Sequence, residues 1–275
     1  MSQDAALTSP ERPSPSTQRV AALGALAIEL ARAGRDLYGV FVRTLFYTVR
    51  GRYERGAVLR QMYLMGNQSL FFLTVVMGFI GMILVLQGGL QAERIVPDPT
   101  LIGSTYLELL IRDLAASIGA LMLATRVGAG IAAEIGSMVV TEQVDALRMC
   151  AADPIDYLIK PRFIASVVMT TVLIIWSATI ATLTGMGTAY LFFEISPNIF
   201  FDLRLVDFGD LSVGLVKCLA YGAAIPIVSG YCGLSTYGGS EGVGWATTRA
   251  VVNSSLAVIM LNFFISGAAF LLIGA

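Results

Sequence analysis

Four charged residues fall inside stretches of sequence that are otherwise apolar. Arg112 and Asp113 are adjacent, and Arg126 and Glu134 lie two helical turns apart on one face, with Gly130 between them. A charge at membrane depth is costly and normally faces a cavity or an oppositely charged partner. These residues could therefore line a polar path or gate for a substrate. The alternative is that they form buried ion pairs that fix the packing of helices.

A polar segment at about 139–160 separates two of the apolar stretches. Its apolar residues recur at helical spacing, at Val140, Val144, Leu147 and Ala151. Glu142 and Asp145 lie three apart on another face, and Asp153 with Pro154 supplies a turn that ends the helix. The pattern predicts a short amphipathic helix that a separate motor protein could grip. The alternative is a surface loop that caps two helices and contacts no partner.

An apolar stripe with one polar end occupies the first long apolar stretch. Its residues are Val76, Phe79, Ile80, Ile83, Leu84 and Gln87. Such a stripe could line a cavity for an acyl chain. Contact with surrounding lipid would produce the same periodicity, and both interpretations stay open.

Several kinds of chemistry are excluded or disfavoured by residue usage. The chain has no histidine, which removes the commonest general base and the commonest transition-metal ligand. Cys150, Cys218 and Cys232 have spacings that fit neither a disulfide framework nor a metal site. No Gly-Lys pair exists for a phosphate-binding loop, so any ATP that drives the chain is bound by another polypeptide. We expect no metal, no cofactor and no catalysis in this chain, and the net charge of -1 offers nothing to nucleic acid.

The elements that must position these residues are membrane-spanning helices. Of 275 residues 56% are hydrophobic and only 13% charged, a composition that no water-soluble fold of this size could bury. Uncharged runs cover 61–92, 163–193, 218–240 and 250–275, each long enough to cross a bilayer. The charged stretch at about 106–138 is counted as a fifth crossing, because without it the segments near Ala146 and the amino end would lie on opposite sides. The prediction is an all-α membrane protein with five crossings in 61–275.

The distribution of arginine and lysine sets the orientation. Nine arginines precede Gln61, and others fall in the second-to-third and fourth-to-fifth connections. By the positive-inside rule the amino end and the segment at 139–160 are cytoplasmic, and the carboxyl end lies outside. Residues 1–18, rich in Ser, Pro and Gln, are predicted to form a disordered cytoplasmic tail. Residues 19–60 are amphipathic and predict a helix lying in the membrane surface, or else docked on a partner.

Three blocks of the sequence resemble the MlaE/YrbE permease family. They are GFIGMILVLQG at 78–88, ATRVGAGIAAEIGSMVVTEQVDALRMCAADPIDYLIKPR at 124–162 and ATTRAVVNSSLAVIMLNFF at 246–264. The resemblance runs from about Val20 to the carboxyl end. It implies a homodimer of permeases in a bacterial inner membrane, each with an interfacial helix, five crossings and a cytoplasmic coupling helix between the second and third.

The resemblance also implies partners and a substrate. Two ABC ATPase subunits with ATP and Mg²⁺, a periplasmic hexamer of MCE-domain proteins and a small cytoplasmic accessory protein are expected. The transported substrate would be phospholipid, in maintenance of outer-membrane lipid asymmetry. The ATPase-coupling residues would be Glu134, Glu142, Asp145, Leu147, Met149, Asp153 and Pro154. Arg112 and Asp113 match an Arg-Glu pair near the lipid cavity, but here the acid is shorter and Leu114-Ala115-Ala116 replaces the family's Leu-Gly-Pro.

Two other functions are weighed against this one. An ion-coupled secondary carrier for a lipophilic substrate would use Arg126, Glu134 and Asp113 as a relay, but the sequence shows no inverted repeat. An intramembrane enzyme is disfavoured because no paired Asp or Ser-Lys arrangement occurs at matched depth.

Overall fold

Five long helical segments run alongside one another in the chain. The computed structural model describes residues 15–51, 55–95, 100–202 and 206–273, with side chains at 28, 31–51, 55–91, 103–202 and 206–272. The segments long and apolar enough to cross a bilayer are Arg55–Gln91, Gly103–Val140, Ile155–Phe193, Phe208–Leu234 and Gly239–Leu272. The predicted all-α architecture with five crossings is confirmed, including the second crossing with its internal charges.

The second crossing is a helix interrupted by two π-helical turns. It consists of α3 (Thr100–Leu109), η1 (Leu110–Leu114), α4 (Ala115–Leu123), η2 (Ala124–Gly128) and α5 (Ala129–Val140). The π turns hold Arg112, Asp113 and Arg126, the charges that lower the hydropathy of this segment. Such turns are rare and concentrate at functional sites.

The first and third crossings pack along each other over most of their length. They are α2 (Arg55–Ile95) and α7 (Lys160–Phe193). A Cβ added at Gly81 would meet the Cα of Ala181 at 2.9 Å, so only glycine permits this approach. In lipid, where no water is expelled between helices, close backbone contact of this kind supplies much of the attraction.

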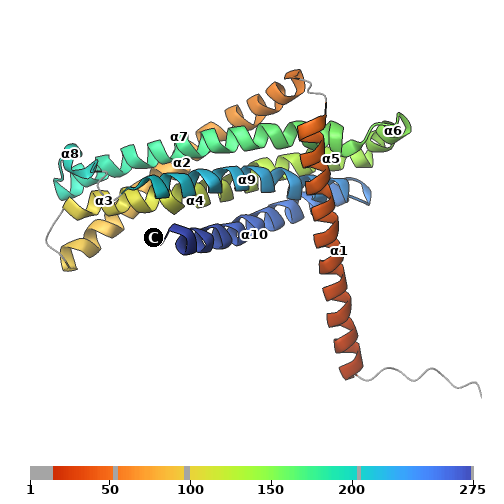
Figure 1. Ribbon diagram of the computed structural model, residues 1–275, viewed down its shortest axis with the longest axis horizontal. Coiled ribbons are helices and arrows are strands. Elements are labelled where there is room, and N and C mark those ends of the chain that lie inside the picture. Colours follow the sequence, from red (N-terminus) through yellow and green to blue (C-terminus); the bar gives the residue numbers. More distant parts are fainter. Residues whose placement is uncertain (1–14, 52–54, 96–99, 203–205, 274–275) are drawn as a thin grey trace, which may run out of the picture.

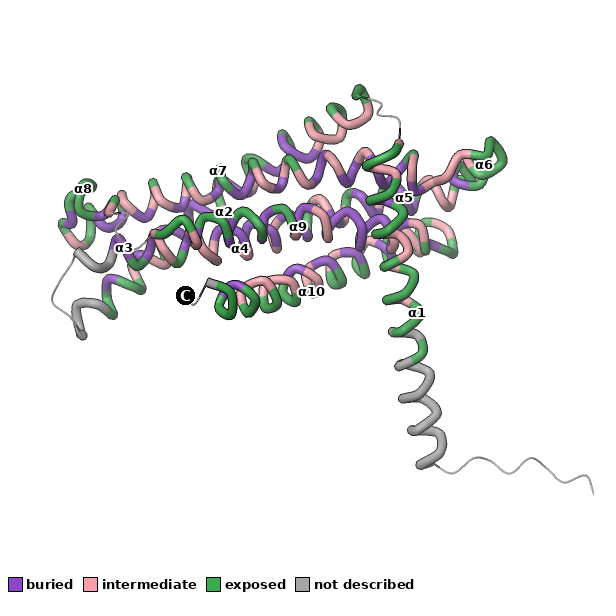
Figure 2. Tube along the Cα trace, in the orientation of Figure 1, coloured by how far each residue is buried: buried purple, intermediate pink, exposed green. Residues whose placement is uncertain are grey.

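The fourth crossing, α9 (Phe208–Leu234), is the most buried of the five. Gly222 brings it against α7, where an added Cβ would lie 2.9 Å from the Cα of Val167. Figure 2 shows buried positions gathered along α4, α7 and α9 and exposed ones along α10 (Gly239–Ile273). The core therefore lies between the second, third and fourth crossings, and α10 covers one side of it.

Shorter elements lie at both ends of the bundle, and one helix runs across it (Figure 1). α1 (Pro15–Arg50) crosses the direction of the other helices, and α6 (Gln143–Met149) projects beyond the end of α5, before η3 (Ile155–Ile159). α8 (Pro197–Phe200) lies at the opposite end beside α3. The tail predicted at 1–18 falls largely outside the described residues, since the described chain begins with α1 at Pro15.

Candidate functional site

A buried lysine on α9 meets the carboxylate of Asp113 within the second crossing. The Lys217 ammonium lies 2.5 Å from the Asp113 Oδ1, and the Ser117 hydroxyl donates to the same oxygen at 3.1 Å. The Lys217 side chain is 1% exposed and that of Asp113 35%. The lysine is thus sealed between helices while its partner faces an opening.

A second ion pair lies beside the first. The Arg112 guanidinium is 3.6 Å from the Asp210 carboxylate at the start of α9. Asp210 also accepts a hydrogen bond from the backbone N–H of Asp207 and completes a capping box that fixes the first turn of α9. Arg112 and Asp113, adjacent in the π turn η1, each bind a different residue of α9 instead of each other. We call Arg112, Asp113, Asp210 and Lys217 the charge cluster.

A polar cavity of about 330 Å³ opens beside the charge cluster. It is lined by Thr105, Glu108, Leu109, Arg112, Asp113, Lys217 and Ser266. Its lining holds two acids, Glu108 and Asp113, and two bases, Arg112 and Lys217, so it suits a zwitterionic group. Within the described ranges no three acidic, cysteine or histidine side chains gather as metal ligands.

The apolar stripe predicted on the first crossing divides between two faces of α2. Phe79, Ile83 and Gln87 are exposed, whereas Ile80 and Leu84 pack against the core and Val76 is half-buried. None of the six lines the cavity beside Arg112 and Asp113. Within one chain, the stripe and the charge cluster are separate surfaces, and the proposal that both line a lipid cavity requires another molecule to join them.

At the other end of the bundle, α6 is held between two residues with left-handed backbone. Glu142 has φ 60° and Ala151 has φ 58°, a conformation that costs residues with a Cβ about 1–2 kcal/mol. Val144 is buried and anchors α6 to the bundle. The predicted short helix is present, and its two ends are turned sharply by strained positions of the kind found at functional sites.

Three of the predicted coupling residues face outward from α6. Glu142 and Asp145 are exposed, Asp145 lies 3.0 Å from Arg148, and Met149 is 88% exposed. Leu147 is half-buried. The exposed surface combines acids with a flexible apolar side chain, which suits contact with another protein.

The other coupling residues are engaged within the chain. Both oxygens of Asp153 are used: Oδ2 accepts the Tyr47 hydroxyl at 2.9 Å, and Oδ1 accepts the backbone N–H of Ile155 at 2.9 Å. The hydrogen bond to Asp153, together with burial, raises the pKa of Tyr47 above its ordinary value. Asp153 thus joins α1 to the start of η3, next to the half-buried Pro154.

Glu134 pairs with Arg162 of α7, and not with Arg126, which lies on the same helical face. Its Oε2 lies 2.8 Å from the Arg162 guanidinium, which is 5% exposed and also donates to the Leu158 carbonyl at 2.7 Å. Arg126 is exposed on η2. A buried ion pair of Arg126 with Glu134, one of the two alternatives weighed from the sequence, is not what the structure shows, because Glu134 binds Arg162 and Arg126 is exposed two turns away.

Sequence reasoning missed Lys217, Asp210, Arg162 and Tyr47 as partners in these contacts. Lys217 had a usable signal, since it is the single charge between Asp210 and Glu241. A single charged residue in a membrane-spanning segment normally faces the interior of the bundle and pairs with an opposite charge or a polar group there. Tyr47 and Arg162 carry no comparable signal, because neither is an isolated charge within an apolar run: Tyr47 is uncharged and Arg162 follows Lys160 in a polar connection.

Known proteins resemble this chain over most of its length. A family model described as Permease MlaE matches residues 58–268. A probable ABC transporter permease protein of Synechocystis is 38% identical over 226 residues, 82% of this chain and 86% of the relative. The intermembrane phospholipid transport system permease protein MlaE of Haemophilus influenzae is 31% identical over 91% of this chain and 97% of its own length. The chloroplastic protein TRIGALACTOSYLDIACYLGLYCEROL 1 of Arabidopsis thaliana is 33% identical over 79% of this chain and 63% of its own.

Proposed function

The chain belongs to the MlaE permease family, and we propose that it moves phospholipid between a bacterial inner membrane and a periplasmic ring of MCE proteins. ATP with Mg²⁺ would be bound by two separate ABC ATPase subunits, and the role would be to maintain outer-membrane lipid asymmetry. The carboxyl end would be periplasmic, the amino end cytoplasmic, and a small accessory protein would join on the cytoplasmic side. The proposal is supported by the relatives' names as ABC permease and phospholipid permease proteins.

The observation that carries this proposal is the geometry of α6. The helix projects from the end of the bundle, exposes Glu142, Asp145 and Met149, and is fixed at both ends. A projection of this kind transmits force only if it is rigid, and Val144 supplies the buried anchor. Movement of α6 would reach the third crossing through Asp153 and the second through α5.

The lipid path would lie between two copies of the chain. The carboxyl-terminal half of α10 is exposed at Phe263, Phe264 and Phe270, as are Phe79, Ile83 and Gln87 on α2. The second copy would cover these surfaces and enclose a cavity for acyl chains. The head group would lie in the cavity beside the charge cluster, where Arg112, the more exposed of the two cations, would bind phosphate. An ion-coupled relay through Arg126, Glu134 and Asp113 is not favoured, since each of the two acids has its own basic partner.

The coupling role is tested by reversing charge on α6. We expect the double variant Glu142→Lys, Asp145→Lys to retain its fold, because both side chains are exposed. In vesicles containing the chain and its ATPase, ATP-dependent lipid transfer should fall about tenfold or more, the effect of losing ~1.4 kcal/mol of contact.

The matched control is Asp36→Lys, which reverses an exposed acid of α1. It should leave transfer unchanged. Lipid transfer at the wild-type rate in the α6 double variant would remove the coupling role, and a chain that transports lipid without any ATPase would remove the proposal as a whole.

A further inference from the structure

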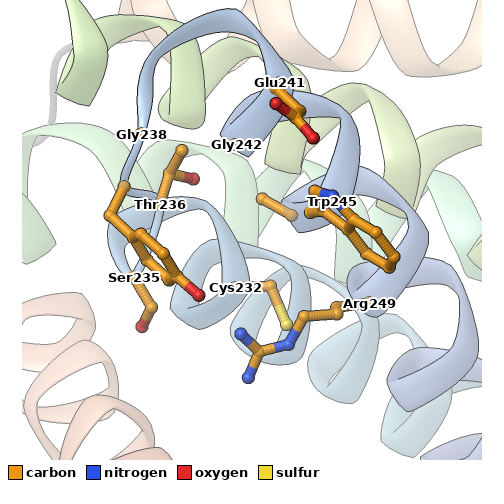
Figure 3. Close-up of a pocket in the computed structure, with 10 residues that line it drawn as sticks. Cys232, Ser235, Thr236, Gly238, Glu241, Gly242, Trp245 and Arg249 are labelled. Carbon is orange, nitrogen blue, oxygen red and sulfur yellow. The ribbon is translucent and has the colours of Figure 1, made fainter.

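A second polar pocket lies at the end of the bundle opposite the charge cluster, where α9 connects to α10. Its volume is about 330 Å³, and its lining includes Thr236, Tyr237, Glu241, Trp245 and Arg249. Figure 3 shows Glu241 at one end and Arg249 at the other, with Trp245 along the side between them. Neither the coupling segment nor the charge cluster contributes a residue to this pocket.

The three α10 side chains form one stripe. Glu241, Trp245 and Arg249 follow each other at four-residue spacing, so they lie on one face and span about 12 Å along the helix axis. All three are exposed, and Trp245 is 66% exposed. Among described residues, Glu241 and Arg249 make no ion pair with each other or with a third side chain. An acid and a base are thus held apart with an indole between them.

The stripe continues into the spanning part of α10 as apolar surface. Val252, Leu256 and Ile259 follow Arg249 at helical spacing and are 59%, 57% and 56% exposed. The polar pocket followed by an exposed apolar strip matches the layout of a lipid, whose polar head group is followed by acyl chains. Tryptophan at this position is typical of the membrane–water interface.

We propose that this pocket binds the head group of a zwitterionic phospholipid from the cytoplasmic leaflet. In that leaflet the phosphate lies nearer the membrane core and the ammonium nearer the cytosol. Arg249 is the deeper of the two charges and binds the phosphate with its planar guanidinium. The ammonium lies against the face of Trp245 and beside the Glu241 carboxylate. The acyl chains run along Val252 and Leu256.

The direction of the charges distinguishes this lipid class from others. The phosphate of an anionic lipid without an amine would pair with Arg249. Glu241 would then face a polar but uncharged group and gain no ion pair. A lipid of the opposite leaflet would present its charges in reverse order. The assignment to the cytoplasmic leaflet rests on the orientation in the proposed function, whereas the pairing of phosphate with Arg249 and amine with Glu241 and Trp245 does not.

The test uses Trp245 as its own reporter. The chain has two tryptophans, and Trp176 lies on α7, where its indole N–H donates to Thr74 at 2.9 Å. The Trp176→Phe chain, purified in detergent, leaves Trp245 as the only indole. Its emission is followed during titration with short-chain phosphatidylethanolamine, phosphatidylglycerol of the same chain length, free phosphoethanolamine and inorganic phosphate.

We expect a saturable shift with phosphatidylethanolamine and binding about tenfold weaker or worse for the other three ligands. Arg249→Gln should weaken the phosphatidylethanolamine response by about tenfold or more. Glu241→Gln should weaken phosphatidylethanolamine but not phosphatidylglycerol. Arg43→Gln, which removes an exposed cation of α1, is the matched control and should change nothing.

Equal affinity for phosphatidylglycerol, equal affinity for inorganic phosphate, or an unchanged response in Arg249→Gln would each overturn the proposal. A change in Trp245 emission on adding the cognate ATPase, with no change on adding any lipid, would also overturn the proposal and would identify a protein-docking surface. If Trp176→Phe fails to fold, lipid retained by the wild-type and Arg249→Gln chains is compared by native mass spectrometry. Binding that persists in a chain without ATP-driven transfer would count against the proposed transport function and not against this site.

Discussion

Replacing Lys217 with methionine should destabilise the bundle by about 2–3 kcal/mol. Methionine keeps the length and flexibility of the side chain and removes the charge that lies 2.5 Å from Asp113. Removing one partner of a fully buried pair costs about 3–5 kcal/mol, because the other charge stays buried alone. Asp113 is 35% exposed toward the polar cavity, so water partly solvates it and the expected loss is smaller.

The double variant Lys217→Met, Asp113→Asn separates the contribution of the ion pair to stability from the contribution of side-chain packing. It removes both charges, and asparagine can still accept the hydrogen bond from Ser117. We expect it to recover part of the lost stability, with a coupling energy of about 1–2 kcal/mol between the two positions. The free energy of unfolding is measured in mixed micelles of dodecylmaltoside and SDS by far-ultraviolet circular dichroism.

An exposed ion pair supplies the comparison. Arg148 and Asp145 lie 3.0 Å apart, and their side chains are 62% and 67% exposed. Arg148→Met should therefore cost less than about 0.5 kcal/mol. If Lys217→Met is as mild as Arg148→Met, or if the two charge-removing changes are additive, the ion pair does not hold α9 to the second crossing and the reasoning fails.

Two further predictions concern packing and pH. Tyr47→Phe should cost about 1 kcal/mol by removing the hydrogen bond to Asp153, as measured by thermal unfolding in detergent. Since the folded state raises the pKa of Tyr47, this stabilisation is present at neutral pH and is lost as pH rises through that raised pKa; a wild-type advantage that persists at still higher pH would contradict it. Gly222→Ala should push α9 away from Val167 and cost about 1–3 kcal/mol, whereas Gly130→Ala, which would meet no atom within 4 Å, serves as the control. Equal effects of the two alanine changes would show that the approach of α9 to α7 is not tight.

The crossings could be predicted from sequence because they depend on composition over some twenty residues. The charged second crossing needed one more constraint, that polar segments on both sides of it fall on consistent sides of the membrane. The polar segment at 139–160 predicted a short helix there, but not its bounds: Val140 ends α5, and α6 stops at Met149, before Ala151 and Asp153. These features are local, so one stretch of chain is enough to reveal each of them.

The partners of the charged residues could not be predicted in the same way. Periodicity places Arg126 and Glu134 on one face of a helix. It does not predict that α7 packs beside that helix and brings Arg162 to Glu134. The sequence predicts only that Asp153 is a turn residue. In the structure α1 lies against this turn, and the Tyr47 hydroxyl donates to Asp153. Contacts between distant segments depend on how whole helices cross, and that information is absent from any single window of sequence.

The two π-helical turns of the second crossing set the direction of the side chains within them. A π turn accommodates one residue more than the α-helix that continues on either side of it. Each residue of an α-helix advances the direction of the side chains by about 100°. Shortening the chain by one position within Leu110–Leu114 would restore unbroken α-helix. The helices on either side would keep their faces, because the π turn had absorbed the extra residue, but the side chains within the turn, Arg112 and Asp113 among them, would be re-aimed by up to that angle. Single-residue deletions should therefore be far more disruptive to ligand handling than to helix content here, and the length of this segment is itself part of the design of the site.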